Sequence, residues 1–297
     1  MSGAVAFSRT EDLVYRPAED GLPALGYDLL VPEQRGGREL VVYLHGGGWR
    51  GGDRRLGSLP EALAAAGVTT ITADYTLTGA APYPRNIEDV FRLLEHVAAR
   101  AADLDVDPAR VFLTGSSSGG HLSGLAATKG LAEDRLALRP AGIIAWYAPL
   151  DPVSRYLKLR YPAEHWPGGF WARGADRPRD AKDLFTPFIG TADFSTVTLR
   201  DALDPDPRFH LDRIDPTELP PFLLLVGTRD SDEIRTAQAN WHAALRSAGA
   251  RAELLVVEGA DHGDDDFTTP ATLGAALGFI RAHSRSDHFP AEASTER

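Results

Sequence analysis

The stretch Arg110–Leu122, RVFLTGSSSGGHL, carries the pattern that decides the fold. Its first five residues are rich in β-branched and apolar side chains, which predicts a buried strand. Gly115–Gly119 then matches G-x-S-x-G, and Leu122–Thr128 fits a buried helix. Between a strand and a helix, this pattern is typical of a strained turn that exposes the hydroxyl of its central serine, here Ser117. The pentapeptide alone also fits a glycine-rich loop or a phosphate-binding turn, but no lysine follows it as in a P-loop.

Outward from this turn, short apolar runs alternate with helical patterns along most of the chain. The predicted strands are Leu25–Val31, Glu39–Leu44, Val68–Ala73, Arg110–Thr114, Ile143–Tyr147, Phe222–Val226 and Leu254–Glu258. The predicted helices are Glu61–Ala66, Asn86–Ala101, Leu122–Thr128, Ile234–Ser247 and Leu273–His283. Such alternation predicts an α/β fold with a mainly parallel, doubly wound sheet, and we expect the first strand to be antiparallel at its edge. Ligands bind such sheets beyond the carboxyl ends of the strands.

The region 151–221 interrupts this alternation. It is rich in proline, aspartate and aromatic residues and has no clear periodicity. A long irregular insertion in a compact domain is usually functional. We therefore expect residues 1–297 to form a single domain in which 151–221 is a cap or lid over the active site. A surface excursion without a role is the alternative interpretation.

A second glycine-rich turn, His45-Gly46-Gly47-Gly48-Trp49, follows the predicted strand Glu39–Leu44. Glycines let backbone N–H groups approach a ligand closely. In acyl transfer, such N–H groups stabilise the carbonyl oxygen as it becomes negatively charged. We expect the turn to form one part of an oxyanion hole and the N–H of Ser118, next to the nucleophile, to form the other. His45 itself is expected to support the turn.

The general base follows by elimination. In hydrolases with this kind of turn, the catalytic residues follow the chain order serine, acid, histidine. The histidines after the serine are His121, His165, His210, His242, His262, His283 and His288. Only His262, in GADHGDDDF, lies in a loop just past the end of a predicted strand. The others lie in predicted helices, in the irregular region or near the tail, so His262 is the predicted base.

The acid is expected in the run Gly227–Asp232, which follows the strand PFLLLVG. Asp230 is the preferred candidate, and it would hold the imidazole tautomer and stabilise the imidazolium. Asp232 is the nearest rival, although it could instead cap the following helix. Asp151, after the strand IIAWY, is a second rival.

Composition narrows the classes of function. The net charge is −11, which argues against a nucleic-acid partner and against docking to an anionic membrane. The absence of cysteine excludes disulfides and thiol nucleophiles. No signal peptide or membrane span is expected, so the predicted location is the cytoplasm. No metal is expected, because the acidic run Asp264–Asp266 lacks the spacing of a calcium site. The sequence gives no oligomeric state.

Three segments resemble a known superfamily. HGGGW at 45–49, Asp74-Tyr75 and GSSSGGHL at 115–122 resemble the hormone-sensitive-lipase-like and bacterial carboxylesterase branches of the α/β hydrolases. HGGGWRGGD and GGHL are also similar to the branch that includes kynurenine formamidases. The resemblance implies an α/β-hydrolase fold and hydrolysis of an ester or amide through an acyl-enzyme, without a cofactor. Two features depart from the pattern: Ser116 stands where the lipase-like branch commonly has aspartate, and 151–221 has no counterpart.

The same resemblance implies a set of site residues. Its catalytic triad corresponds to Ser117, Asp230 and His262, and its oxyanion hole to Ser118 with the glycines after His45. The glycines are Gly46, Gly47 and Gly48, of which the last two are favoured.

We therefore predict a serine esterase that acts on small-molecule carboxylic esters. Three tryptophans, Trp49, Trp166 and Trp171, would offer apolar surface to the substrate. Packing inside the cap is the alternative role for them. A formamidase, a lactonase or an esterase for a bulky natural product is the alternative within enzymes. A hydrolase-fold protein that binds a small molecule without catalysis is the alternative outside them.

Overall fold

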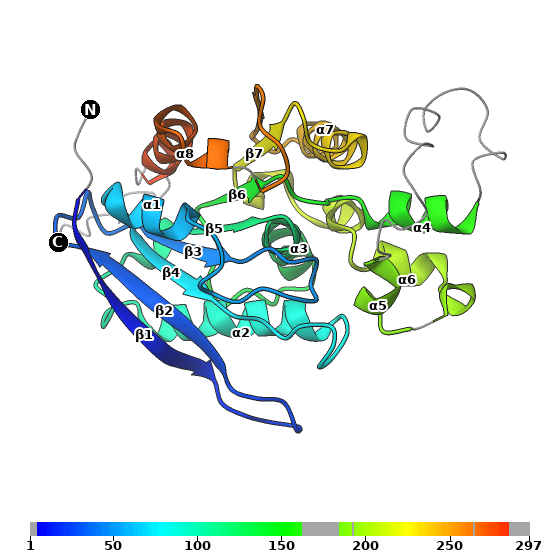
Figure 1. The fold of residues 1–297 in the computed structure, drawn as a ribbon, viewed down its shortest axis with the longest axis horizontal. Coiled ribbons are helices and arrows are strands. Elements are labelled where there is room, and N and C mark those ends of the chain that lie inside the picture. The colour runs from blue at the N-terminus through cyan, green and yellow to red at the C-terminus, as the bar shows by residue number, and fades with distance from the viewer. Residues whose placement is uncertain (1–4, 162–183, 192, 264, 285–297) are drawn as a thin grey trace, which may run out of the picture.

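The computed structural model describes residues 5–161, 184–191, 193–263 and 265–284. Its centre is an eight-stranded sheet with the order β1-β2-β4-β3-β5-β6-β7-β8 (Figure 1). The strands are β1 Phe7–Arg16, β2 Leu25–Pro32, β3 Leu40–Leu44, β4 Thr69–Ala73, β5 Val111–Ser116, β6 Gly142–Trp146, β7 Phe222–Gly227 and β8 Ala252–Val257. The pairs from β4 across to β8 are parallel, while β1 and β2 run antiparallel to their neighbours. The α/β fold with a mainly parallel sheet is confirmed.

The edge of the sheet differs from the prediction. β2 is antiparallel, as expected, but β1 pairs with its outer side and forms the edge. The sequence of β1, FSRTEDLVYR, gives little sign of a strand, because most of its side chains are exposed or only partly buried. A strand that covers little core needs no apolar run, so periodicity does not reveal it.

Helices pack on both faces of the sheet and create two apolar cores. Alternate residues of each central strand point to opposite faces, so Val42 and Leu113 join one core while Val41 and Phe112 join the other. The first core lies under α2 and α3, and the second lies under α1 and α8. The main helices are α1 Leu59–Ala65, α2 Arg85–Arg100, α3 Ser118–Ala132, α7 Asp232–Ser247 and α8 Pro270–His283.

The described parts of 151–221 contain short helices. They include α4 Pro152–Arg160, α5 Phe185–Phe188 and α6 Leu199–Leu203. Figure 1 shows these helices together, on the side of the molecule toward which β3 and β6 point. Trp166 and Trp171 lie outside the described residues. Within the described ranges, no helix has both the length and the apolar character that a membrane crossing requires.

The buried strands predict where substitutions are costly. Leu113 on β5 is fully buried, whereas Leu199 on α6 is largely exposed. We expect Leu113→Ala to lower the free energy of unfolding by about 2–5 kcal/mol, because it leaves a cavity that the sheet cannot close. Leu199→Ala removes the same atoms from the surface and should change it by less than about 0.5 kcal/mol. Urea denaturation of both variants measures the difference, and equal effects would contradict the assigned core.

Candidate active site

Ser117 lies at the turn between β5 and α3, with a backbone conformation that few residues other than glycine adopt. Its φ is 49° and its ψ is −119°. Its N–H donates to the carbonyl oxygen of Trp146 on β6, at 2.9 Å. Such strain persists only where the surroundings impose it. The backbone at Ser117 therefore follows neither the direction of β5 nor that of α3, and the serine stands at a sharp turn between them.

Glycines surround the strained serine because the chain is crowded there. A Cβ at Gly115 would come within 2.6 Å of the carbonyl oxygen of Leu44. A Cβ at Gly119 would overlap with that same oxygen, and one at Gly120 would lie 2.7 Å from the oxygen of Gly115. These distances are far below van der Waals contact. The glycines of the G-x-S-x-G pattern are thus required by close packing of β3, β5 and α3.

The structure brings the predicted serine, histidine and acid into one hydrogen-bonded line. Nε2 of His262 lies 3.0 Å from Oγ of Ser117, and Nδ1 lies 2.9 Å from Oδ2 of Asp230. The Asp230 carboxylate is almost completely buried, and its Oδ1 accepts the N–H of Ser231 at 2.6 Å. With its proton on Nδ1, the imidazole donates to the acid and leaves Nε2 free to accept from the serine hydroxyl.

The rival acids have other partners. Asp232 lies in the first turn of α7, exposed, and pairs with Arg235 on the same helix. Asp151 caps α4 by accepting the N–H of Ser154 at 2.9 Å and forms an ion pair with Arg208. Of the three candidates, only Asp230 contacts His262 among the described hydrogen bonds.

The turn after β3 has three successive residues with positive φ. These are Gly47 at 124°, Gly48 at 62° and Trp49 at 59°. A Cβ at Gly47 would overlap with the carbonyl group of Gly51, and one at Gly48 would lie 2.7 Å from the side chain of Leu184. Within the part of the chain that the structure describes, the N–H groups of both glycines have no acceptor. They are therefore available to a ligand beside Ser117.

His45 and the first glycine of the turn lie behind it. His45 is buried, its ring stacks on Tyr75 at 4.4 Å, and its Nδ1 lies 2.7 Å from the carbonyl oxygen of Gly46. Burial lowers the pKa of His45, so its imidazole is neutral at physiological pH. A Cβ at Gly46 would lie 3.1 Å from Oγ of Ser116, which places the turn directly against the serine turn.

Two cavities meet at Ser117 and His262. The apolar chamber, of about 380 Å³, has walls of Trp49, Phe185, Phe188, Ile234 and Ala237. The tyrosine chamber, of about 450 Å³, has walls of Tyr43, Leu59, Ser116, Tyr147 and Phe267. Gly48 and Leu184 border both. An acyl group and an alcohol group bound to one serine could therefore occupy separate spaces.

Trp49 has two kinds of contact. It lines the apolar chamber, as predicted for a substrate-binding residue, but it is almost fully buried. Its Nε1 donates to Nδ1 of His121 at 3.3 Å, and its ring lies 4.5 Å from that of Phe188. Burial lowers the pKa of His121 to about 4, so the ring is neutral; its Nε2 lies 2.8 Å from the carbonyl oxygen of Pro205, which puts the proton there and leaves Nδ1 as an acceptor. Trp49 thus joins α3 to the described part of 151–221.

Tyr147 is a site residue that the sequence analysis missed. It follows β6, has a φ of 38°, and places its ring 4.9 Å from that of His262 in an edge contact. The ring also packs on Phe267 at 4.8 Å. A non-glycine residue with positive φ beside a candidate base indicates a functional constraint. Its sequence signal is weak, because IIAWY reads simply as a buried strand.

Comparison with known proteins identifies the fold family of the chain. The model of the family described as alpha/beta hydrolase fold matches residues 41–264, which include both glycine turns, Asp230 and His262. The chain belongs to the α/β-hydrolase fold family. The resemblance stated from the sequence is confirmed at this level.

Two similar proteins from Mycobacterium tuberculosis are hydrolases. The carboxylesterase NlhH is 30% identical over 287 residues, which cover 89% of this chain and 82% of that protein. The carboxylic ester hydrolase LipN is 27% identical over 238 residues, which cover 78% of this chain and 58% of that protein.

Two similar solved structures show the shared fold. Esterase B from Lactobacillus rhamnosis has a TM-score of 0.71 at 18% identity, covering 93% of this chain and 85% of that one. A truncated carbohydrate esterase from gut microbiota has a TM-score of 0.73 at 20% identity, covering 96% and 98%.

The crowding at the serine turn of this hydrolase makes a testable prediction. We expect Gly119→Ala to lower the free energy of unfolding by about 1–3 kcal/mol or more, because the new methyl group overlaps with backbone atoms of β3. Gly278→Ala in α8 is the matched control, since a Cβ there meets nothing within 4 Å. That change should stabilise by up to about 1 kcal/mol through helix propensity. Thermal and urea unfolding of the two variants give the comparison; a neutral Gly119→Ala would contradict the packing.

Proposed function

We propose that this α/β hydrolase cleaves carboxylic esters of small molecules through an acyl-enzyme on Ser117. The observation that carries the proposal is the line of hydrogen bonds from Ser117 through His262 to Asp230, with distances of 3.0 Å and 2.9 Å. The chain is a hydrolase of the carboxylesterase type, as its similarity to named carboxylesterases indicates. The residues and steps below are our proposal for how it works.

In the first step, His262 accepts the proton of Ser117 as the serine oxygen attacks the ester carbonyl carbon. Asp230 holds the imidazole with Nδ1 toward its carboxylate and stabilises the imidazolium that forms. The carbonyl oxygen becomes an oxyanion and accepts hydrogen bonds from Gly47, Gly48 and Ser118. When the tetrahedral intermediate collapses, the C–O bond breaks and His262 gives its proton to the departing alcohol.

In the second step, water resolves the acyl-enzyme. His262 accepts a proton from water, whose oxygen attacks the acyl carbon, and the same N–H groups stabilise the second oxyanion. The carboxylic acid leaves as Ser117 recovers its proton. No step needs a cofactor. Formamidase or lactonase activity would use the same residues, and a panel of esters, lactones and formamides would separate these substrates.

Replacement of the nucleophile tests the proposal directly. Ser117→Ala should reduce turnover of p-nitrophenyl acetate by at least about 10⁴-fold, because no other hydroxyl replaces the attacking oxygen. A fluorophosphonate probe should label the wild type on the peptide that contains Ser117 and should not label the variant. Full turnover in Ser117→Ala would exclude the assigned nucleophile. Absence of labelling and of turnover in the wild type would favour a binding protein without catalysis.

Replacement of the acid distinguishes Asp230 from its neighbour. Asp230→Asn should lower kcat by about 10⁴-fold, because the amide favours the wrong tautomer of His262. Asp232→Asn makes the same chemical change two residues away, on the exposed side chain paired with Arg235. We expect that control to retain kcat within about threefold, since it loses only a surface ion pair. The reverse ranking in steady-state assays would assign the acid to Asp232.

A further inference from the structure

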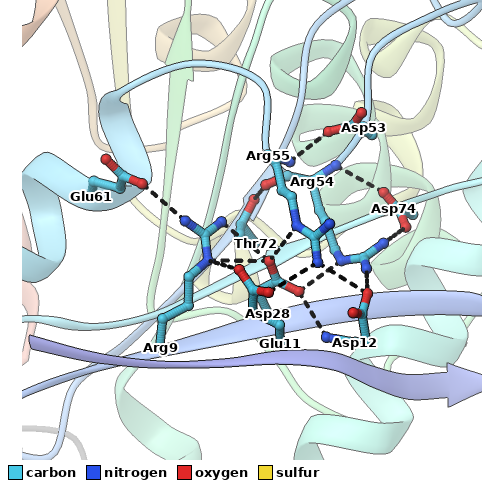
Figure 2. Close-up of polar contacts among 10 residues, drawn as sticks. All are labelled: Arg9, Glu11, Asp12, Asp28, Asp53, Arg54, Arg55, Glu61, Thr72 and Asp74. Atoms are coloured by element: carbon cyan, nitrogen blue, oxygen red, sulfur yellow. Dashed lines mark hydrogen bonds and ion pairs between the residues drawn. The ribbon is translucent and has the colours of Figure 1, made fainter.

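Figure 2 shows a carboxylate, Asp28, with three guanidinium partners, which are Arg9, Arg54 and Arg55 and are called the arginine cluster below. Asp28 on β2 is fully buried. Its oxygens lie 3.1 Å from Nη2 of Arg9, 2.8 Å from Nε of Arg54 and 3.2 Å from Nε of Arg55. Burial acts to raise the pKa of Asp28, but hydrogen bonds from Arg54, Arg55 and the N–H of Asp12 outweigh it and lower the pKa. Asp28 is thus a fixed negative charge beneath this arginine cluster.

Within this arginine cluster, each arginine pairs with three carboxylates in the described ion pairs, and Arg54 is the one that reaches Asp74. Its side chain bridges Asp28 on β2 and Asp74 just after β4. Its backbone is held as well, because its N–H donates to Asp74 at 2.8 Å and its carbonyl oxygen accepts from the hydroxyl of Thr72 at 2.6 Å. Gly26 on β2 leaves room for the guanidinium, since a Cβ there would lie 3.3 Å from its central carbon. Both the main chain and the side chain of Arg54 are therefore fixed to the sheet.

The glycine turn is continuous with this anchor. The N–H groups of Arg50 and Gly51 donate to the carbonyl oxygen of Gly47 at 3.2 Å and 3.1 Å, which closes the turn on itself. Gly52 packs against the turn, since a Cβ there would lie 2.7 Å from Nδ1 of His45. Arg54 follows two residues later. The restraint on Arg54 therefore acts at the exit of the turn.

The segment 74–78 holds the other parts of the same turn. The hydroxyl of Tyr75 donates to the carbonyl oxygen of His45 at 3.0 Å, at the entrance of the turn. The N–H of Thr78 donates to the carbonyl oxygen of Trp49 at 2.9 Å, in its middle. Asp74 holds its exit through Arg54. One short segment after β4 thus contacts the turn at its entrance, its middle and its exit. The contact at the exit is an ion pair, and the other two are hydrogen bonds.

We propose that Arg54 is a positioning residue that holds the N–H groups of Gly47 and Gly48 in place for the oxyanion. The inference rests on the proposed function. Those two N–H groups must stay free for the substrate, so they cannot hold the turn themselves. An oxyanion hole works only when its donors are fixed before the reaction. The ion pairs of Arg54 with Asp28 and Asp74 supply that restraint from outside the site.

The test compares two arginines that share one partner. Arg54→Met and Arg9→Met each remove one of the three guanidinium groups around Asp28 and leave two, so both variants are expected to fold. Arg9 approaches from β1 and does not contact the turn in the described ion pairs. We expect Arg54→Met to lower kcat for p-nitrophenyl acetate by roughly 10- to 100-fold with KM changed less than about threefold. Arg9→Met should lower the thermal midpoint while kcat stays within about twofold of the wild type.

A second measurement reports on the oxyanion hole itself. An alkyl trifluoromethyl ketone adds to the serine and forms a stable oxyanion, so its Ki follows transition-state binding. In Arg54→Met, the Ki should rise by the same factor as kcat/KM falls, and in Arg9→Met it should not change. Arg54→Lys keeps the charge but replaces the planar, five-donor guanidinium by a compact ammonium group, so it should fall between the wild type and Arg54→Met. Asp74→Asn should fall there too, because the exit of the turn loses its ionic contact.

The outcomes separate this inference from the proposed function. If Ser117→Ala is inactive and the ketone inhibits the wild type, the proposed function stands. Unchanged kcat and Ki in Arg54→Met, Arg54→Lys and Asp74→Asn would then overturn only the role of Arg54. Equal losses of kcat in Arg9→Met and Arg54→Met would also overturn it, because the arginine cluster would then act through general stability. An active Ser117→Ala would instead overturn the proposed function.

Discussion

The packing of Gly119 against the carbonyl groups of Leu44 and His45 is the contact on which the site depends. A Cβ at position 119 would overlap with both, so α3 can start against the end of β3 only with glycine there. This contact places the serine turn beside the glycine turn, although the two are far apart in the sequence. It also keeps Ser117 at a φ of 49°, because the end of β3 and the start of α3 cannot separate without opening the sheet. One backbone contact therefore sets where the serine turn lies relative to the glycine turn.

The remaining parts of the site come from the other strands at the same edge. Asp230 follows β7 and His262 follows β8, and parallel strands bring both to the carboxyl end of the sheet. The acid is almost fully buried and its second oxygen is bonded to the N–H of Ser231, so it is rigid. The base is about two-fifths exposed, and its orientation is set by Asp230 on one side and by the ring of Tyr147 on another. In the proposed mechanism, a rigid acid thus directs a base that must exchange protons with solvent and substrate.

The sequence predicted the parts of this architecture that are local. The glycine-rich pattern is specific in residues 110–122 and 45–49, because strained turns and close packing require glycine and few other structures do. The strand and helix order followed from alternation, and the parallel sheet followed from that order. β1 was missed because an edge strand with exposed side chains needs no apolar pattern. Tyr147, the arginine cluster and the chamber walls were missed because they depend on contacts between distant segments, which no single stretch records.

The residues that would contact the substrate differ in origin from the residues that the proposed reaction uses. The groups that the proposed mechanism uses come from two glycine turns and two strand ends, and they would serve an α/β hydrolase whatever its substrate. The walls of the two chambers come from elsewhere: Phe185 and Phe188 from the region 151–221, Ile234 from α7, Tyr147 from the end of β6. Ser116, which stands where the lipase-like branch commonly has aspartate, accepts a hydrogen bond from Tyr43 and contributes a hydroxyl group to the wall of the tyrosine chamber. Charged side chains lie in the same walls, among them Arg155 and Glu233 in the apolar chamber and Asp265 in the tyrosine chamber, so mostly apolar surface and a few charges together surround Ser117.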